Sequence, residues 1–393
     1  MRFGWVDFSS EERKRIIQAI KALETSGTID ELGIGVIRDG FADQLFPGIS
    51  VLQTRAKYYI TVPDIYRRAM RNKILKTPDS VSQFIHKEED GIAESLRKKG
   101  NYGVIGERGP VRYKPSQIYW NGLRTFGIVR DGRISQSAVV RKIAAFHHRD
   151  ENTETNKYDK SDEADDESSN LYGIRSDFNF FEGNVDCSTL DLSRKEAEYL
   201  YEKIKSSSAK DSLLAWLLDY SISNGIPEKL EDIDRSLLPK DMGNVLARAI
   251  EFRNFIYGAH LLYNRLYAEH LHMDEESEEF DKKYDDWHAT AFDSIDVEAV
   301  LSAARAGRNS DKQFIRDFYR YAKTDKKEAS ELIRQREHFK KQGNSKLFIE
   351  VPEGADIKYS SVHDFKLEYR YSTVKAIIED IVAGLKREDK SNV

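Results

Sequence analysis

Residues 30–70 read DELGIGVIRDGFADQLFPGISVLQTRAKYYITVPDIYRRAM, and this stretch sets the helical character of the N-terminal part of the chain. Apolar side chains recur at helical spacing at Leu32, Val36, Ile37, Phe41 and Leu45. Phe46-Pro47-Gly48 predicts a turn after this helix. Beyond the turn we expect one helix up to about Tyr59 and a second from Asp64, because Pro63 lacks the N–H that a continuous helix needs.

The rest of the sequence is also dominated by helical patterns. Their expected positions are 78–99, 115–126, 135–146, 193–204, 213–222, 244–272, 274–288, 296–306, 311–323, 325–341 and 374–385. The 244–272 segment is apolar nearly all round between Phe252 and Leu266, which is typical of a helix at the centre of a bundle. Only KLFIEV, residues 346–351, alternates like a strand. The fold class is therefore mainly α, with an N-terminal helical domain, a C-terminal helical bundle and little strand.

Charge is distributed unevenly along the chain. Residues 1–149 contain 26 Lys and Arg against 16 Asp and Glu, whereas residues 171–393 contain 34 against 42. Residues 150–170, DENTETNKYDKSDEADDESSN, are acidic and too poor in apolar side chains to offset the entropy of ordering. We predict a basic domain over 1–149, a disordered acidic linker over 150–170 and a helical-bundle domain over 171–393.

Two helices separated by a turn form the best candidate for a DNA-reading unit. Residues 115–126 are followed by an Asp-Gly turn at 131–132 and by a helix capped by Ser135. This order is the outline of a helix-turn-helix or winged-helix unit, whose second helix would expose Gln136, Ser137, Arg141 and Lys142. An ordinary αα-hairpin has the same generic spacing and remains an alternative.

Several motifs together resemble a family of bacterial proteins known only as a domain of unknown function. The matching segments are FGWVDFS at Phe3–Ser9, the block Asp30–Tyr66, and PSQIYW to FGI at Pro115–Ile128. The resemblance implies an association with gene neighbourhoods of anti-phage functions. It implies no biochemical activity and no catalytic residues.

Cations interleaved with aromatic side chains carry the strongest functional signal. Lys and Arg make sequence-independent contacts with phosphates, and aromatic rings can stack on bases. The candidate nucleic-acid-binding residues are Arg55, Lys57, Arg108, Arg112, Lys114, Arg124, Gln136, Arg141 and Lys142. The expected partner is nucleic acid, with duplex DNA as the form, and the helical bundle is expected to recruit a protein partner. The opposing interpretation is that the aromatics are core and the cations form a solvated face.

Other functional classes receive less support. The chain contains one cysteine, no phosphate-binding Gly-x4-Gly-Lys-Ser/Thr motif and no apolar run long enough for a membrane span. His260, His270 and His272 do not share a helical face, so we expect no metal site among them. We also expect no cofactor and no catalytic residue. The leading hypothesis is a non-enzymatic, cytoplasmic nucleic-acid-binding accessory protein. A protein-only scaffold and a metal-dependent nuclease using Glu350 and Asp356 are the alternatives.

Overall fold

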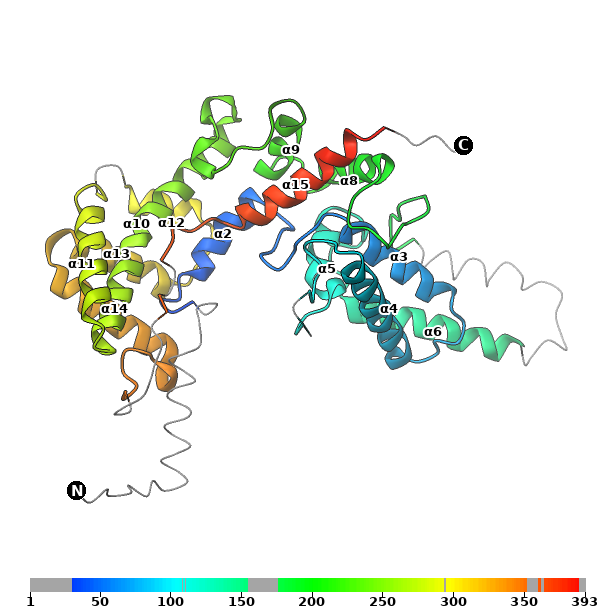
Figure 1. Ribbon diagram of the computed structural model, residues 1–393, viewed down its shortest axis with the longest axis horizontal. Helices are drawn as coiled ribbons and strands as arrows, with labels where there is room; N and C mark the ends of the chain where they lie inside the picture. Colours follow the sequence, from blue (N-terminus) through cyan, green and yellow to red (C-terminus); the bar gives the residue numbers. More distant parts are fainter. Residues whose placement is uncertain are drawn as a thin grey trace, which may run out of the picture. The chain divides into compact units, whose positions relative to one another are not determined.

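The structure is a computed structural model that describes residues 30–107, 109, 111–154, 176–292, 295–351, 360–361 and 364–388. It is mainly helical, which confirms the predicted fold class (Figure 1). Within these residues there is no β-sheet, and one isolated antiparallel bridge joins Val129 to Phe178. The alternating segment 346–351 forms turns, so the prediction of a strand there is wrong. An isolated alternating run has no strand to pair with, and Lys346 is instead buried beside the Glu31 carboxylate.

The chain forms two compact units, each built from segments that are distant in sequence. Unit 1 contains residues 30–42 and Pro239–Tyr369, and unit 2 contains Asp43–Leu238 and the residues from Arg370 onward. The division of the sequence into a domain over 1–149, a linker over 150–170 and a domain over 171–393 stays a prediction. Helix α6 continues to Glu154, and the remainder of the predicted acidic linker lies outside the described residues.

Unit 1 is a helical bundle around one long helix. Its helices are α10 (Lys240–His270), α11 (Asp274–His288), α12 (Val297–Ala303), α13 (Asn309–Thr324) and α14 (Lys326–Lys341). Helix α10 packs against α11, α12 and α14, which confirms the central position predicted from its apolar surface (Figure 1). Gly258 in α10 lies directly under the Trp287 ring of α11, where a Cβ atom would overlap the indole. Trp287 also donates a hydrogen bond from Nε1 to the Asn254 carbonyl at 2.8 Å.

A buried arginine attaches the start of the described chain to the unit 1 bundle. Arg336 of α14 donates from Nε to the Leu32 carbonyl at 2.7 Å and from Nη2 to the Gly33 carbonyl at 3.2 Å. The same guanidinium pairs with Asp311 of α13 at 2.6 Å. One side chain therefore satisfies both a buried charge and two backbone carbonyls that would otherwise lack partners.

Apart from α2, the remaining α-helices in the described residues belong to unit 2. They are α3 (Tyr58–Arg71), α4 (Pro78–Lys98), α5 (Pro115–Thr125), α6 (Gln136–Glu154), α8 (Arg194–Ser206), α9 (Leu213–Asn224) and α15 (Tyr371–Leu385). Helix α2 (Gly35–Leu45) crosses the boundary between the units at Ala42. Helix α3 packs on α4 and α5, α4 packs on α6, and α15 packs on α8 and α9. The amphipathic pattern at 374–385 thus predicted α15 correctly.

Helix α3 runs through Pro63, so the predicted break at that residue is wrong. Pro63 lies in the second turn, where it removes only one intrahelical hydrogen bond. The first turn is held by packing: Tyr59 is 1% exposed and its ring contacts Tyr119 at 4.8 Å and Phe126 at 5.1 Å between centroids. Burial of such a side chain contributes roughly 1.5–3 kcal/mol, which is comparable with the cost of the proline.

Candidate nucleic-acid interface

The starts of α5 and α6 lie side by side in unit 2. Gln136, the first residue of α6, donates from Nε2 to the Ser116 hydroxyl in the first turn of α5 at 2.9 Å. The connection 126–135 folds back on α5, because Trp120 Nε1 donates to the Ile134 carbonyl at 3.1 Å. The first turn of α5 and the start of α6, 20 residues apart at Ser116 and Gln136, therefore meet in unit 2.

The local sequence explains both helix starts. Pro115 occupies the first position of α5, and Gln117 Oε1 accepts the Lys114 N–H at 3.0 Å. At the start of α6 the Ser135 hydroxyl accepts the Ala138 N–H at 3.2 Å, as the sequence predicted for a cap. These caps fix the first residue of each helix and therefore the backbone positions from which the side chains around Lys114 and Ser135 extend.

A helix-turn-helix unit is not confirmed by this arrangement. The DNA-binding motif joins its helices by a turn of about 3–4 residues, whereas the α5–α6 connection spans 126–135. A winged helix needs a β-hairpin, and the part of the chain that the structure describes contains only the Val129–Phe178 bridge. The connection is tied instead to residues 177–179, with Arg130 N–H donating to the Asp177 carbonyl at 2.9 Å.

Two of the predicted cations are used inside unit 2. Lys57 is 1% exposed, and its Nζ lies 2.7 Å from each carboxylate oxygen of Glu196. Arg55 donates from Nε to the Asp380 carboxylate at 2.9 and 3.0 Å, and it also pairs with Asp191 at 3.2 Å. Both side chains join α3 and its preceding loop to the distant elements α8 and α15. In this conformation the Lys57 ammonium cannot contact a phosphate.

Two more predicted cations have a carboxylate partner but keep some exposure. Lys114 pairs with Asp90 of α4, and its side chain is 25% exposed. Lys142 pairs with Asp177 at 2.8 Å with its side chain 49% exposed. Such pairs contribute little free energy, about 0–1 kcal/mol, so a phosphate can compete with the carboxylate.

The other predicted residues differ in availability. Arg112 is exposed, with its guanidinium 5.2 Å from the centre of the Tyr113 ring. Arg141 is exposed on α6. Arg124 is half-buried and donates to Asn121 Oδ1 at 3.3 Å. Gln136 is occupied by its bond to Ser116, and Arg108 lies outside the described residues.

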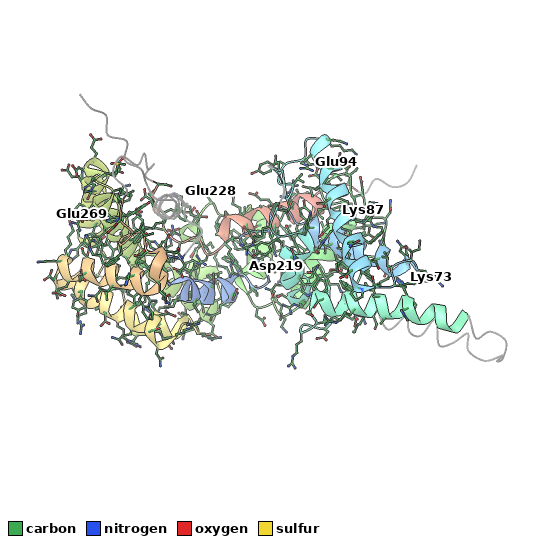
Figure 2. The ribbon with its side chains drawn as sticks, turned by 90° about the horizontal axis from the view of Figure 1, so that it is seen from below. Lys73, Lys87, Glu94, Asp219, Glu228 and Glu269 are labelled. Atoms are coloured by element: carbon green, nitrogen blue, oxygen red, sulfur yellow. The ribbon has the colours of Figure 1, made fainter. Side chains whose placement is uncertain are left out.

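Helix α6 presents one exposed stripe without acidic side chains. Ser137, Arg141, Ala145 and His148 are exposed and follow i, i+4, i+8 and i+11, the spacing of a single helix face. The opposite face, which includes Val139 and Ile143, is buried. The surface of α4 differs, since Figure 2 shows Lys87 and Glu94, one of each sign, on that helix.

Sequence reasoning missed two arginines beside this stripe. Arg133 is exposed in the connection just before α6, and Arg130 is exposed with its Nε donating to Asn179 Oδ1 at 2.8 Å. The sequence could have indicated them, because Arg130 and Arg133 flank the Asp131-Gly132 turn and therefore lie shortly before the start of a predicted helix. We call Arg112, Lys114, Arg133, Arg141 and Lys142 the α5–α6 edge.

An internal carboxylate already occupies the start of α5. Glu89 of α4 is 3% exposed and accepts the Ser116 N–H at 2.6 Å through Oε1. Burial raises the pKa of Glu89 to about 7, while the Ser116 N–H acts in the opposite direction. Because this carboxyl satisfies the first turn of α5, the cationic side chains rather than the helix end are available for an external anion.

The residues of the nuclease alternative are only partly described. His270 Nε2 lies 2.8 Å from the Ile349 carbonyl, next to Glu350, whereas Asp356 falls outside the described residues. No group of three or more His, Cys, Asp or Glu suited to a metal ion occurs in the described ranges. Within the same ranges, no helix combines the length and hydropathy needed to cross a membrane.

Comparison with known proteins places the chain in a family. Neither the curated proteins nor the solved structures contain a match to it. One family model matches residues 1–383, which is nearly the whole sequence. The chain therefore belongs to DUF6361, a family of unknown function.

Proposed function

We propose that this protein binds nucleic acid without acting on it, and that the α5–α6 edge contacts the phosphate backbone. The observation that carries the proposal is the exposed stripe of α6, which includes Arg141 and has no acidic side chain from Ser137 to His148, together with exposed Arg112 and Arg133 in the same unit. The proposed partner is duplex DNA, the proposed compartment is the cytoplasm, and the bundle of unit 1 is proposed to recruit a protein. The link to anti-phage functions rests on the family resemblance and stays a prediction.

The chemistry of the edge suits a backbone contact rather than base reading. Arginine and lysine neutralise phosphates and release counterions, which gives affinity that depends on salt but not on sequence. The Arg112 guanidinium, stacked on Tyr113, adds a flat cationic surface that can contact a phosphate or an unpaired base. Gln136, the side chain best suited to read adenine, is bonded to Ser116.

Fluorescence anisotropy with duplex DNA, single-stranded DNA and RNA at two salt concentrations tests the proposal. The double variant Arg112→Ala/Arg141→Ala is expected to weaken binding and to reduce the salt slope for duplex DNA by about 1.8, roughly 0.9 per lost contact. The matched control Lys210→Ala/Arg235→Ala removes two exposed positive charges elsewhere in unit 2 and is expected to leave the slope unchanged. Equal slopes for the edge variant and the native chain would refute the assignment.

The internal ion pairs favour a second candidate, a scaffold that binds only protein. Arg55, Lys57, Lys114 and Lys142 each have a carboxylate partner within unit 2. A protein whose cations serve its own fold shows no binding to any polyanion even at low salt. Absence of anisotropy change with all three nucleic acids, with a protein partner retained in a pull-down, would select this candidate.

A further inference from the structure

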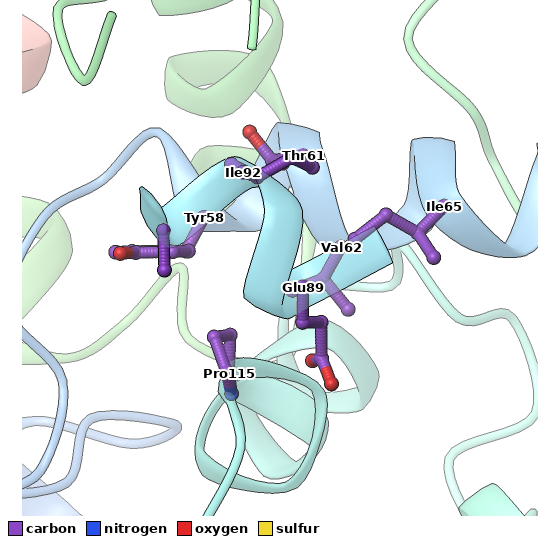
Figure 3. A pocket seen from close by; sticks show the side chains of 8 residues that line it. Tyr58, Thr61, Val62, Ile65, Glu89, Ile92 and Pro115 are labelled. Atoms are coloured by element: carbon purple, nitrogen blue, oxygen red, sulfur yellow. The ribbon is translucent and has the colours of Figure 1, made fainter. Parts of the chain in front are cut away.

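Glu89 is a buried carboxyl at the meeting point of four helices of unit 2. It lies on α4 and faces α3, the first turn of α5 and the start of α6 through Ser116 and its neighbours. Beside it is a cavity of about 10 Å³ between α3 and α4, whose lining includes Tyr58, Val62, Ile65 and Ile92 as well as Glu89 itself (Figure 3). A cavity needs at least about 10–15 Å³ to hold one water molecule, so no cluster of waters can solvate the carboxyl there.

The two oxygens of Glu89 have unequal surroundings. Oε1 accepts the Ser116 N–H at 2.6 Å, whereas Oε2 is buried without a hydrogen-bond partner. The hydroxyl of Tyr66, which belongs to α3 and is fully buried, faces the Gln136 and Ser116 side chains and lies near the Glu89 carboxyl. A buried carboxylate with one unsatisfied oxygen is unfavourable, and a proton on that oxygen removes the unsatisfied charge.

The charges around Glu89 do not compensate for its burial. Desolvation is the largest influence and raises the pKa of Glu89 to about 7, against the smaller lowering effects of Ser116 and Lys114. Asp90 on the same helix raises it further. Helix α3 contributes the neutral hydroxyls of Tyr58 and Tyr66, and α6 contributes the neutral amide of Gln136.

We propose that Glu89 is a proton-binding site of unit 2, and that uptake of a proton at near-neutral pH stabilises the packing of α4 against the start of α5. Lys114 lies close enough to act on the Glu89 carboxyl, but protonation of this site does not depend on nucleic-acid binding. A carboxyl whose pKa is higher in the folded chain than in the unfolded chain stabilises the folded state at pH values at which it is protonated. Its contribution is complete below the ordinary pKa of 4.5 and is lost as the pH rises through about 7.

Thermal unfolding of the full chain at about pH 6 and about pH 8 tests the proposal. With these two pKa values the folding equilibrium constant falls about tenfold over this interval, which is a decrease in Tm of roughly 3–6 °C for a unit of this size. Glu89→Gln keeps an acceptor for the Ser116 N–H and cannot ionise, so this variant is expected to lose that decrease. The difference in Tm between Glu89→Gln and the native chain therefore shifts in favour of the variant as the pH rises from about 6 to about 8.

A matched control separates Glu89 from the other groups that titrate over the same interval. Glu94→Gln makes the same chemical change on α4, at a side chain that is 59% exposed and labelled in Figure 2. It is expected to follow the native pH dependence. If the native chain, Glu89→Gln and Glu94→Gln all show the same change in Tm, the proposal is wrong.

A measurement on the native chain covers the case in which Glu89→Gln does not fold. With ¹³C-labelled glutamate, one side-chain carboxyl resonance is expected to titrate with a midpoint near pH 7. Assignment follows from Lys114→Met, which removes a lowering influence and moves that midpoint upward. If every glutamate carboxyl titrates within about one unit of its ordinary pKa, Glu89 is not the proposed site.

Discussion

Replacing Lys57 by methionine tests whether this cation belongs to the fold or to a binding surface. Lys57→Met preserves the aliphatic length of the side chain and leaves Glu196 buried without its countercharge. The carboxylate keeps only the Ser193 N–H of its own helix start, at 2.9 Å. Removing one partner of a buried pair costs roughly 3–5 kcal/mol, because an uncompensated charge remains in the interior. For a unit of this size we expect Tm to fall by roughly 6–20 °C.

A double-mutant cycle separates the pair from the packing of Lys57. Glu196→Gln in addition to Lys57→Met removes the unpaired charge while keeping an acceptor for Ser193. We expect the double variant to recover much of the loss, with a coupling free energy of roughly 2–3 kcal/mol. Unfolding of the native chain, both single variants and the double variant is followed by circular dichroism under one set of conditions.

The control for this experiment is an exposed ion pair on α8, the helix that carries Glu196. Arg194 and Glu198 of α8 pair at 2.9 Å with both side chains 46% exposed. Arg194→Ala is expected to cost at most about 0.5 kcal/mol. If Lys57→Met costs no more than this, the ammonium is not buried in an ion pair and our account of Lys57 is refuted. A salt slope for DNA binding that falls with Lys57→Met while stability is retained would refute it as well.

Two further substitutions probe close contacts in unit 2. Gly122→Ala places a Cβ 2.5 Å from the Tyr59 hydroxyl and 2.7 Å from the Gly48 carbonyl, so we expect a loss of roughly 1–3 kcal/mol in the free energy of unfolding, measured by urea denaturation. Asp380→Asn removes the carboxylate whose two oxygens share the Nε–H of Arg55, and we expect a loss of roughly 2–4 kcal/mol in the free energy of unfolding. A change within experimental error would contradict the role assigned to this pair.

Periodicity in the sequence predicted the helices well because it reflects local physics. The apolar surface of 244–272 and the spacing at 374–385 appear in the structure as α10 and α15. The errors arose where tertiary packing overrides local preference. Pro63 is tolerated inside α3 because Tyr59 and its aromatic neighbours hold the first turn. Segment 346–351 has no strand partner among the residues that the structure describes.

The candidate site was harder to predict because pairing depends on contacts between distant residues. Nothing near Arg55 in sequence indicates that Asp380, 325 residues away, will accept its hydrogen bonds. A run of cations looks the same whether its partners are phosphates or the protein's own carboxylates. Arg112 and Arg141 remained exposed, whereas Lys57 did not, and only the fold distinguishes them.

The two segments of unit 2 are separated in the chain by Pro239–Tyr369, the larger segment of unit 1. Bringing the ends of a disordered segment of that length together costs roughly 4 kcal/mol of chain entropy. Within unit 1, however, the Tyr369 hydroxyl donates to the Ala249 carbonyl at 2.6 Å, on the helix that begins at Lys240. By the rise of an α-helix, the two ends of the inserted segment are then held within about 15–20 Å of each other. A folded unit 1 thus closes the loop in advance, so α15 reaches α8 and α9 at a lower entropic cost than it would across an unfolded insertion.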